Sequence, residues 1–307
     1  VGSEMCIRDS REAVEEVAQL KKEGSLFTPD TYEAPLIDFK KRPTVVKALC
    51  LHIAHDCNLA CRYCFAEEGE YHGRRALMSY ETGKAALDFL IANSGSRRNL
   101  EVDFFGGEPL MNFEVVKQLV AYGREQEKLH DKHFRFTLTT NGVLLNDDIM
   151  EFANREMDNV VLSIDGRKEV HDHMRPFRKG AGSYDLIVPK FQKFAKSRNQ
   201  EKYYVRGTYT HFNTDFSKDV LHLADLGFKQ ISVEPVVAEE TDDYAIKEED
   251  LPVLFKEYDD LAAEMVRRNK AGNGFNFFHF MIDLEGGPCV YKRLSGCGSG
   301  TEYLAVT

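Results

Sequence analysis

The sequence predicts an α/β fold in which parallel strands alternate with helices. Six runs rich in β-branched and aromatic residues recur along the chain, and stretches with a helical spacing of apolar residues lie between them. The strand-like runs cover residues 45–54, 101–105, 134–139, 159–164, 203–210 and 230–236. Such alternation implies β/α units joined by right-handed crossovers. A partial six-strand barrel and an open doubly wound sheet both fit this pattern.

Apolar stripes define the expected helices. Ser79 is placed to cap a helix over residues 80–93, and Asp250 to cap one over residues 250–268 with Pro252 in its first turn. Shorter stripes mark further helices, namely Val115, Val116, Leu119 and Val120, and later Leu221, Ala224 and Leu226. These helices fill intervals between the strand-like runs.

The chain divides into four expected segments. Residues 1–10 (VGSEMCIRDS) look non-native and are set aside, which leaves Cys6 without an expected role. Residues 11–43 are expected to form a charged helix and a linker. Residues 44–275 are expected to form the core of the fold, and residues 276–307 to belong to a further region.

Composition and charge exclude several classes of protein. The 307 residues include 40 Lys and Arg against 50 Asp and Glu, which gives a net charge of −10. Such a balance lacks the general attraction for nucleic-acid phosphates or anionic lipids that a basic protein has. No apolar run approaches the roughly 20 residues that cross a bilayer, and the start carries no signal peptide. We therefore expect a cytoplasmic protein without nucleic-acid or membrane partners.

Three of the seven cysteines, Cys57, Cys61 and Cys64, lie within eight residues. Thiolates so close together can converge on one metal centre, and soft sulfur ligands select zinc, Cu(I) or iron–sulfur clusters. Three thiolates are one short of the four that usually complete such a site. Either another side chain completes a zinc site, or one position stays open for a substrate or cofactor. The candidates for a fourth zinc ligand are His52, His55 and His72.

The spacing CxxxCxxC, preceded by a strand-like run and followed by Phe65, resembles the signature of radical S-adenosylmethionine (radical SAM) enzymes. In that family three thiolates bind three irons of a [4Fe–4S] cluster, and S-adenosylmethionine (SAM) chelates the fourth iron. The resemblance implies this role for Cys57, Cys61 and Cys64, and a cofactor contact for Tyr63. It also implies a partial (β/α)6 TIM-like barrel as the fold.

A second motif, Gly106-Gly107-Glu108-Pro109, directly follows the second strand-like run. Two glycines let the backbone approach a ligand closely, and functional residues of α/β barrels collect where strands end. The motif resembles the GGEP sequence of the same family. This resemblance implies that Gly106, Gly107 and Glu108 hold the ammonium group of SAM.

Later strands supply further candidates. Ser163 and Asp165 are two residues apart and so share a face of a strand; the resemblance to peptide-modifying members implies that they contact the cofactor's ribose. For Arg206 it implies a grip on the cofactor's carboxylate, with an ion pair to Glu234 as the alternative. The turn at Asn141-Gly142 is equally consistent with a functional role and with a plain turn.

Cys289 and Cys297 follow the expected barrel in glycine-rich surroundings. Here the chain is similar to radical SAM enzymes with a C-terminal SPASM or twitch region. The similarity implies that both cysteines begin an auxiliary [4Fe–4S] site, and that residues 276–307 are the start of a truncated SPASM region. Two buried, unliganded cysteines are the alternative.

Within that group, the run Leu-His-Ile-Ala-His-Asp before Cys57 and the run Tyr-Cys-Phe-Ala from Tyr63 most resemble enzymes that install thioether cross-links in six-cysteine (SCIFF) peptides. The resemblance implies that a reduced cluster cleaves SAM to methionine and a 5′-deoxyadenosyl radical. This radical abstracts hydrogen from a peptide residue, and a cysteine sulfur then bonds to that carbon.

The same resemblance implies the partners. They are a small cysteine-rich precursor peptide and an electron donor such as ferredoxin or flavodoxin, in an anaerobic organism. Two alternatives stay open. One is an anaerobic sulfatase-maturating enzyme, which makes formylglycine, and the other is a non-catalytic iron–sulfur or zinc binding module.

Overall fold

The computed structural model describes residues 13–27, 44–281 and 298–307, within two compact units, Val1–Pro43 and Thr44–Thr307. In the first unit a helix covers residues 13–22, in agreement with the helix expected there. The expected non-native segment and most of the linker lie outside the described residues. All expected strands fall in the second unit.

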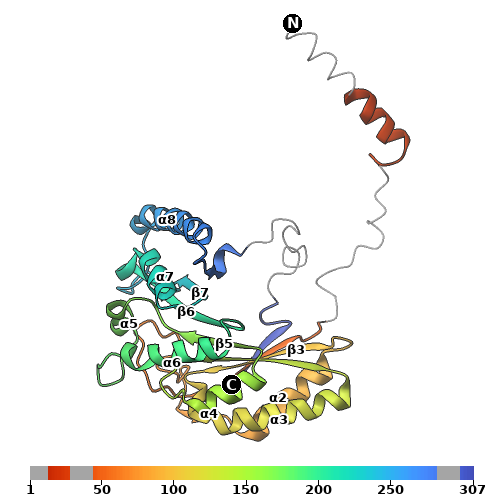
Figure 1. The fold of residues 1–307 in the computed structure, drawn as a ribbon. Helices are drawn as coiled ribbons and strands as arrows, with labels where there is room; N and C mark the ends of the chain where they lie inside the picture. The colour runs from red at the N-terminus through yellow and green to blue at the C-terminus, as the bar shows by residue number, and fades with distance from the viewer. Residues whose placement is uncertain (1–12, 28–43, 282–297) are drawn as a thin grey trace. The chain divides into compact units, whose positions relative to one another are not determined.

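The second unit is built on one nine-stranded sheet (Figure 1). Its strands are β1 (Ala48–His55), β2 (Ala76–Leu77), β3 (Asn99–Gly106), β4 (His133–Thr140), β5 (Asn159–Ser163), β6 (Tyr203–Tyr209), β7 (Gln230–Pro235), β8 (Asn276–Phe277) and β9 (Tyr303–Val306). Every pairing is parallel except that of β1 with β2. The six expected strands correspond to β1 and β3 to β7, which confirms the α/β fold class.

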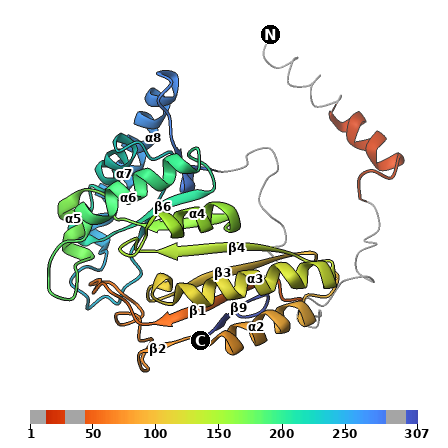
Figure 2. The ribbon, with the colours of Figure 1, turned by 60° about the horizontal axis from the view of Figure 1, so that its bottom comes forward.

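Strand order distinguishes the two expected architectures. A doubly wound sheet reverses its strand order and carries helices on both faces. Here the order is β2-β1-β3-β4-β5-β6-β7-β8, without such a reversal, and helices cover one side of the curved sheet (Figure 2). In the described residues β8, at one end of the sheet, does not pair with β2 or β9 at the other. The core is therefore a partial barrel.

The helices of this unit are α2 (Tyr80–Asn93), α3 (Phe113–His130), α4 (Asp147–Glu156), α5 (Lys168–Met174), α6 (Tyr184–Ser197), α7 (Phe216–Asp225) and α8 (Leu251–Lys270). Ser79 caps α2 as expected, because its hydroxyl accepts the amide of Thr82 at 3.1 Å. The helix α8 begins after Asp250 as expected. The Asp250 carboxylate, however, accepts the amide of Lys247 and pairs with His211 instead of capping α8.

The two faces of the sheet differ in character. Leu49, Leu51 and Ile53 of β1 are fully buried, and they join one apolar core with the helices. The alternate residues face the other way and are largely polar. We call this second face the inner face; it includes Cys50, His52, Asp103, Phe105, Thr137, Thr139, Ser163, Arg206, Thr208, Ser232 and Glu234. The inner face is therefore where a polar ligand can be bound.

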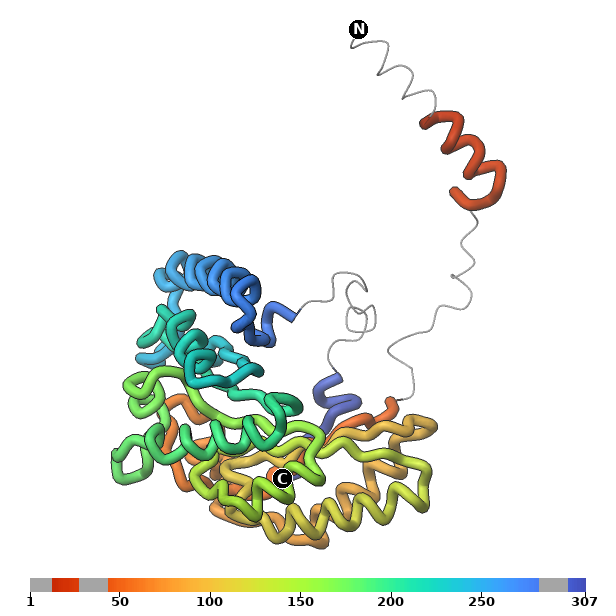
Figure 3. The backbone as a smooth tube through the Cα atoms, viewed as in Figure 1, coloured from red at the N-terminus to blue at the C-terminus, as the bar shows by residue number. Residues whose placement is uncertain are grey.

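The last described strand lies next to the first strand of the barrel. β9 pairs in parallel with β1, with Ala48 opposite Tyr303 and Leu51 opposite Val306, and Figure 3 shows the two segments together. The Tyr303 hydroxyl donates to Asp103 on β3 at 2.8 Å. Residues 303–306 thus extend the sheet, while the expected boundary at residue 275 stays a prediction. No described helix is both long enough and apolar enough to span a membrane.

Candidate cofactor-binding site

Cys57, Cys61 and Cys64 lie on the loop between β1 and β2, and none of them forms a disulfide. The loop is anchored at several points. The amide of Cys57 donates to the Asp56 carboxylate at 2.9 Å, and the amide of Leu59 lies 3.5 Å from the Cys57 sulfur. Backbone bonds from residues 60 and 62 to residues 176 and 174 fix its far side. The three thiols are thus held on a loop that is fixed at both sides.

Burial makes two of these thiols, those of Cys57 and Cys61, weaker acids. It raises the pKa of Cys57 to about 12 and that of Cys61 to about 11. A metal that binds the thiolates replaces those protons, as it does at any cysteine-ligated site. No three His, Cys, Asp or Glu side chains in the described part of the chain converge on a single metal ion. A cluster needs no such convergence, because each thiolate binds a different iron.

The zinc alternative finds no support in the positions of the histidines. The rings of His52 and His55 pack on Tyr71, with centroids 4.3 and 4.9 Å away. His72 pairs with Glu67 at 2.8 Å. The histidines therefore have aromatic or carboxylate neighbours, and the described residues form no single-ion site with the cysteines.

Glu108 presents a carboxylate that is fixed before any ligand arrives. It is 1% exposed, and it accepts from the Thr140 hydroxyl at 2.8 Å and from the amides of Asn141 and Leu110 at 2.7 and 3.0 Å. Burial raises its pKa to about 7, although these hydrogen bonds act in the opposite direction. An ammonium group beside it would compensate for the burial and favour the charged carboxylate.

Gly106 and Gly107 let this loop approach the cysteine loop. Gly106 has φ +119°, and a Cβ on Gly107 would lie 2.1 Å from the carbonyl oxygen of Asp56. The amides of Gly107 and Glu108 donate to the carbonyls of Ala54 and Asp56 at 2.8 and 2.9 Å. The two glycines therefore allow backbone to pack closely on backbone, which places Glu108 beside the loop of Cys57, and the ammonium contact expected for them stays a prediction.

Asn141 contacts both the cysteine motif and Glu108 of the GGEP motif. The turn at Asn141-Gly142 therefore lies at the site. The side-chain amide of Asn141 donates to Asn58 at 2.7 Å and lies 3.6 Å from the Cys57 sulfur, while its backbone amide binds Glu108. The sequence did not decide whether this turn has a functional role, because an Asn-Gly pair does not show which residues of other loops it contacts. Asn58 carries no sequence signal beyond its place in the motif.

Asp165 is fully buried and engaged by the protein itself. The Tyr63 hydroxyl donates to both carboxylate oxygens, at 2.8 and 2.7 Å, and Arg175 and the amide of Thr208 donate to one of them at 2.9 and 3.1 Å. The Arg175 guanidinium also lies over the Tyr63 ring, 5.3 Å from its centroid. Asp165 thus fixes Tyr63 next to Cys64, and the ribose contact expected for it stays a prediction.

Ser163 and Arg206 are direct neighbours on β5 and β6. Arg206 is half exposed and forms an ion pair with Glu234 on β7. This pair is the alternative that the sequence allowed, and it leaves the exposed part of the guanidinium free to meet a ligand. Cofactor contacts of Ser163 and Arg206 remain predictions.

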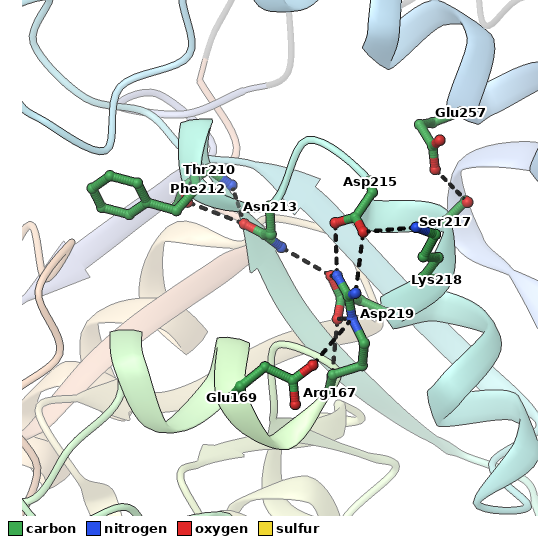
Figure 4. A network of polar contacts seen from close by, with 10 residues as sticks. All are labelled: Arg167, Glu169, Thr210, Phe212, Asn213, Asp215, Ser217, Lys218, Asp219 and Glu257. Atoms are coloured by element: carbon green, nitrogen blue, oxygen red, sulfur yellow. Dashed lines mark hydrogen bonds and ion pairs between the residues drawn. The ribbon is translucent and has the colours of Figure 1, made fainter.

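A network centred on Arg167 holds the loop that follows Ser163 and Asp165 (Figure 4). Arg167 donates to Asp219 at 2.8 Å and pairs with Asp215 at 2.7 Å, both on or next to α7. A Cβ on Gly166 would lie 2.2 Å from the Asp219 side chain. The sequence did not indicate this clamp, since its partners are about 50 residues apart. Cys289 and Cys297, the expected auxiliary ligands, lie outside the described residues.

Known families and proteins with similar sequences or folds include radical SAM enzymes. The family model described as Radical SAM superfamily matches residues 51–226. An uncharacterized protein of Methanocaldococcus jannaschii, MJ0907, is 31% identical over 61% of this chain and 62% of its own length. The radical SAM cyclopropyl synthase TigE of Paramaledivibacter caminithermalis is 23% identical over 55% of this chain and 38% of its own.

The cysteine-type anaerobic sulfatase-maturating enzyme of Clostridium novyi is 28% identical over 43% of this chain and 36% of its own length. The chain thus spans less than two thirds of each of these relatives. Among solved structures, anSMEcpe with bound AdoMet covers 76% of this chain and 64% of its own, at 20% identity and a TM-score of 0.66. Streptococcus suis SuiB bound to S-adenosylmethionine covers 96% and 68%, at 18% identity and 0.62. These two likenesses concern the fold.

Proposed function

The chain belongs to the radical SAM superfamily, and from this premise we propose that it is an enzyme that forms Cys-derived thioether cross-links in a ribosomally made, cysteine-rich peptide. The observation that carries the proposal is the placement of three free cysteines beside a preformed carboxylate. Cys57, Cys61 and Cys64 share one anchored loop, and Glu108 is packed against the same loop. An iron–sulfur cluster and an amino-acid-bearing cofactor need these two features side by side.

In this proposal Cys57, Cys61 and Cys64 hold a [4Fe–4S] cluster, and SAM occupies the inner face beside it. The cluster and the cofactor together would supply the radical chemistry that removes a hydrogen atom from the peptide. The protein's own residues bind the cofactor. Glu108 binds the ammonium group of SAM, Ser163 contacts its ribose and Arg206 its carboxylate. Tyr63 lies beside the cofactor. The role of these residues is to orient the cofactor and to keep water and side reactions away.

Two supports favour a peptide as substrate. The curated relatives include TigE and a sulfatase-maturating enzyme, and anSMEcpe was solved with bound AdoMet and the Kp18Cys peptide. The resemblance of the motifs around Cys57 and Tyr63 to those of SCIFF-peptide enzymes supports thioether formation as the reaction. We further propose a ferredoxin or flavodoxin as electron donor, an auxiliary cluster that begins at Cys289 and Cys297, and a cytoplasmic location.

Mass spectrometry of a synthetic six-cysteine peptide tests the proposal. The anaerobically reconstituted protein is incubated with SAM, dithionite and the peptide. We expect the peptide to lose the mass of two hydrogen atoms per cross-link, with fragments that place a thioether on a cysteine. A Cys57→Ala variant serves as control and should form neither product nor 5′-deoxyadenosine.

The sulfatase-maturating activity is a second candidate, favoured by the likeness to the Clostridium novyi enzyme. It converts a cysteine or serine to formylglycine, which reacts as an aldehyde. A product that forms a hydrazone and shows no thioether fragments would replace the first proposal by this one. Absence of SAM cleavage in a cluster-loaded preparation would leave a non-catalytic iron–sulfur module.

A further inference from the structure

The inner face carries an imidazole–carboxylate pair next to the expected cofactor contacts. Glu234 lies on β7, and His279 lies in η4 (Phe278–Phe280), which follows β8. Nε2 of His279 is 3.9 Å from Oε1 of Glu234. Arg206 holds the other carboxylate oxygen, and the hydroxyl of Ser232 donates to Oε1 at 3.3 Å. The carboxylate is thus fixed by its strand neighbours and faces the imidazole.

The two ring nitrogens of His279 have different surroundings. Nε2 is enclosed, has no hydrogen-bond partner and has Glu234 as its charged neighbour. Nδ1 is not enclosed and makes no hydrogen bond with a described residue. The side chain is 31% exposed. The Glu234 carboxylate thus lies on the enclosed side of the ring, and Nδ1 lies on its open side.

Other titratable groups around the inner face are already engaged or covered. The carboxylates of Asp165, Glu108 and Asp103 each accept a hydrogen bond from at least one side chain, and the first two also from backbone amides. The unpartnered nitrogens of His52 and His55 are enclosed where both rings pack on Tyr71. His279 is therefore a partly exposed base beside Glu234 and the expected cofactor contact Arg206. His72, His133 and His211 also pair with carboxylates in the described residues, but with Glu67, Glu127 and Asp250.

We propose that His279 accepts the thiol proton of the substrate cysteine and that Glu234 stabilises the resulting imidazolium; this inference rests on the proposed thioether function. The S–H bond breaks, the proton passes to Nδ1, and the electron pair stays on sulfur. A thiol with an ordinary pKa of about 8.5 is mostly protonated at neutral pH, and the thiolate is the reactive form. Arg206, which binds Glu234, lies opposite Ser163 on the next strand, so Glu234 connects the base to the expected cofactor contacts.

The test compares His279→Gln with a control, His222→Gln. His222 bonds the Tyr184 hydroxyl at 2.6 Å between α6 and α7, on the helix side of the sheet. Each cluster-loaded full chain is incubated with SAM, dithionite and the synthetic six-cysteine peptide, and thioether and 5′-deoxyadenosine are both quantified. Loss of a general base costs on the order of 10²-fold or more in its step. We expect at least a tenfold lower ratio of thioether to 5′-deoxyadenosine for H279Q, and the wild-type ratio for H222Q.

Two further readouts separate proton transfer from a structural role. A peptide with selenocysteine at the cross-linked position should restore the ratio in H279Q, because a selenol is already ionised at neutral pH. Affinity for the six-cysteine peptide, measured by fluorescence anisotropy, should stay within about twofold of wild type. If H279Q fails to fold or to load its cluster, Glu234→Gln tests the same pair and should also lower the ratio.

An unchanged ratio in H279Q, or no recovery with the selenocysteine peptide, would overturn the inference while the thioether function stands. A wild-type enzyme that forms no thioether would overturn the proposed function, and this inference with it.

Discussion

Tyr63 and Asp165 form a buried pair in which one phenol donates to both oxygens of one carboxylate. The sequence predicted that both residues belong to the site, from the cysteine motif and from the end of a strand. It did not show that they bind each other, because 102 residues separate them. Residue identity can therefore place a side chain near a site, whereas its partner depends on how the strands meet.

Removing the phenol oxygen should cost stability. In Tyr63→Phe the buried Asp165 loses one of its donors, which costs about 1–3 kcal/mol for an unsatisfied buried group. We expect the free energy of unfolding in urea, measured on cluster-free protein, to fall by that amount. Tyr80→Phe is the control, since the Tyr80 hydroxyl has no hydrogen bond in the described residues. Equal losses in the two variants would contradict the assignment.

Glu108 gives the fold a pH dependence with a definite sign. Burial raises its pKa from 4.5 to about 7. Between these values the folded protein keeps a proton that the unfolded chain has released, so the free energy of unfolding falls as pH rises from about 5 to about 8. At about 1.4 kcal/mol per pKa unit, the contribution is about 3 kcal/mol.

Urea unfolding of cluster-free wild type and Glu108→Gln across this pH range measures the effect. As pH rises, the free energy of unfolding of wild type should fall relative to that of Glu108→Gln, because only wild type must bury a charged carboxylate at that position. Parallel pH profiles would show that Glu108 does not titrate differently on folding.

Among the elements, the loop after β3 is the most tightly constrained by backbone contacts. Gly107→Ala would put a Cβ 2.1 Å from the Asp56 carbonyl oxygen, and a backbone atom cannot yield as a side chain can. We expect this variant to separate the Glu108 loop from the cysteine loop and to lower the iron and sulfide content after reconstitution at least fivefold. In the control variant Gly73→Ala, the nearest atom to the added Cβ would be 3.3 Å away. This variant should bind as much iron and sulfide as wild type.

The link between the loop after β5 and α7 depends on one arginine. Asp219 is fully buried and Arg167 is its charged partner. Arg167→Met leaves a buried carboxylate without that partner, and breaking such a pair costs about 3–5 kcal/mol. The melting temperature should therefore drop sharply. Lys193→Met, which removes an exposed pair with Asp147, should change it little; similar shifts in both would argue against the clamp.

At the scale of the whole molecule, the sequence predicted the alternation of strands and helices correctly, since each element is encoded locally by its apolar spacing. It also predicted the order of the motifs at the strand ends. It could not predict that β9 would pair with β1, because Tyr303 and Ala48 are far apart in the chain. The choice between a barrel and a doubly wound sheet likewise depended on strand order, which periodicity does not contain.

β9 also covers the cysteine that the motifs leave aside. Burial raises the pKa of Cys50 to about 11, and Cys50 lies opposite Ala305 on β9. A chain that ends at residue 297 should expose this thiol and restore a more ordinary pKa. We expect iodoacetamide to label Cys50 at least about fivefold faster in it, as measured by peptide mapping.

Tyr303→Phe is the control, because it keeps the strand and removes one hydroxyl. Its Cys50 should react no faster than that of wild type. Equal labelling of Cys50 in the truncated chain and in wild type would show that β9 does not shield it.

The unpaired ends of the sheet have a topological consequence. In a closed ring of strands, a polymer can reach the interior only through one of the two ends of the ring. In the described residues, β8 does not pair with β2 or β9, so the strands form an arc with a seam. A flexible chain can be laid across an arc sideways with both termini outside. Under the proposed peptide-modifying function, such a seam would admit a residue in the middle of the substrate chain as well as one near its end.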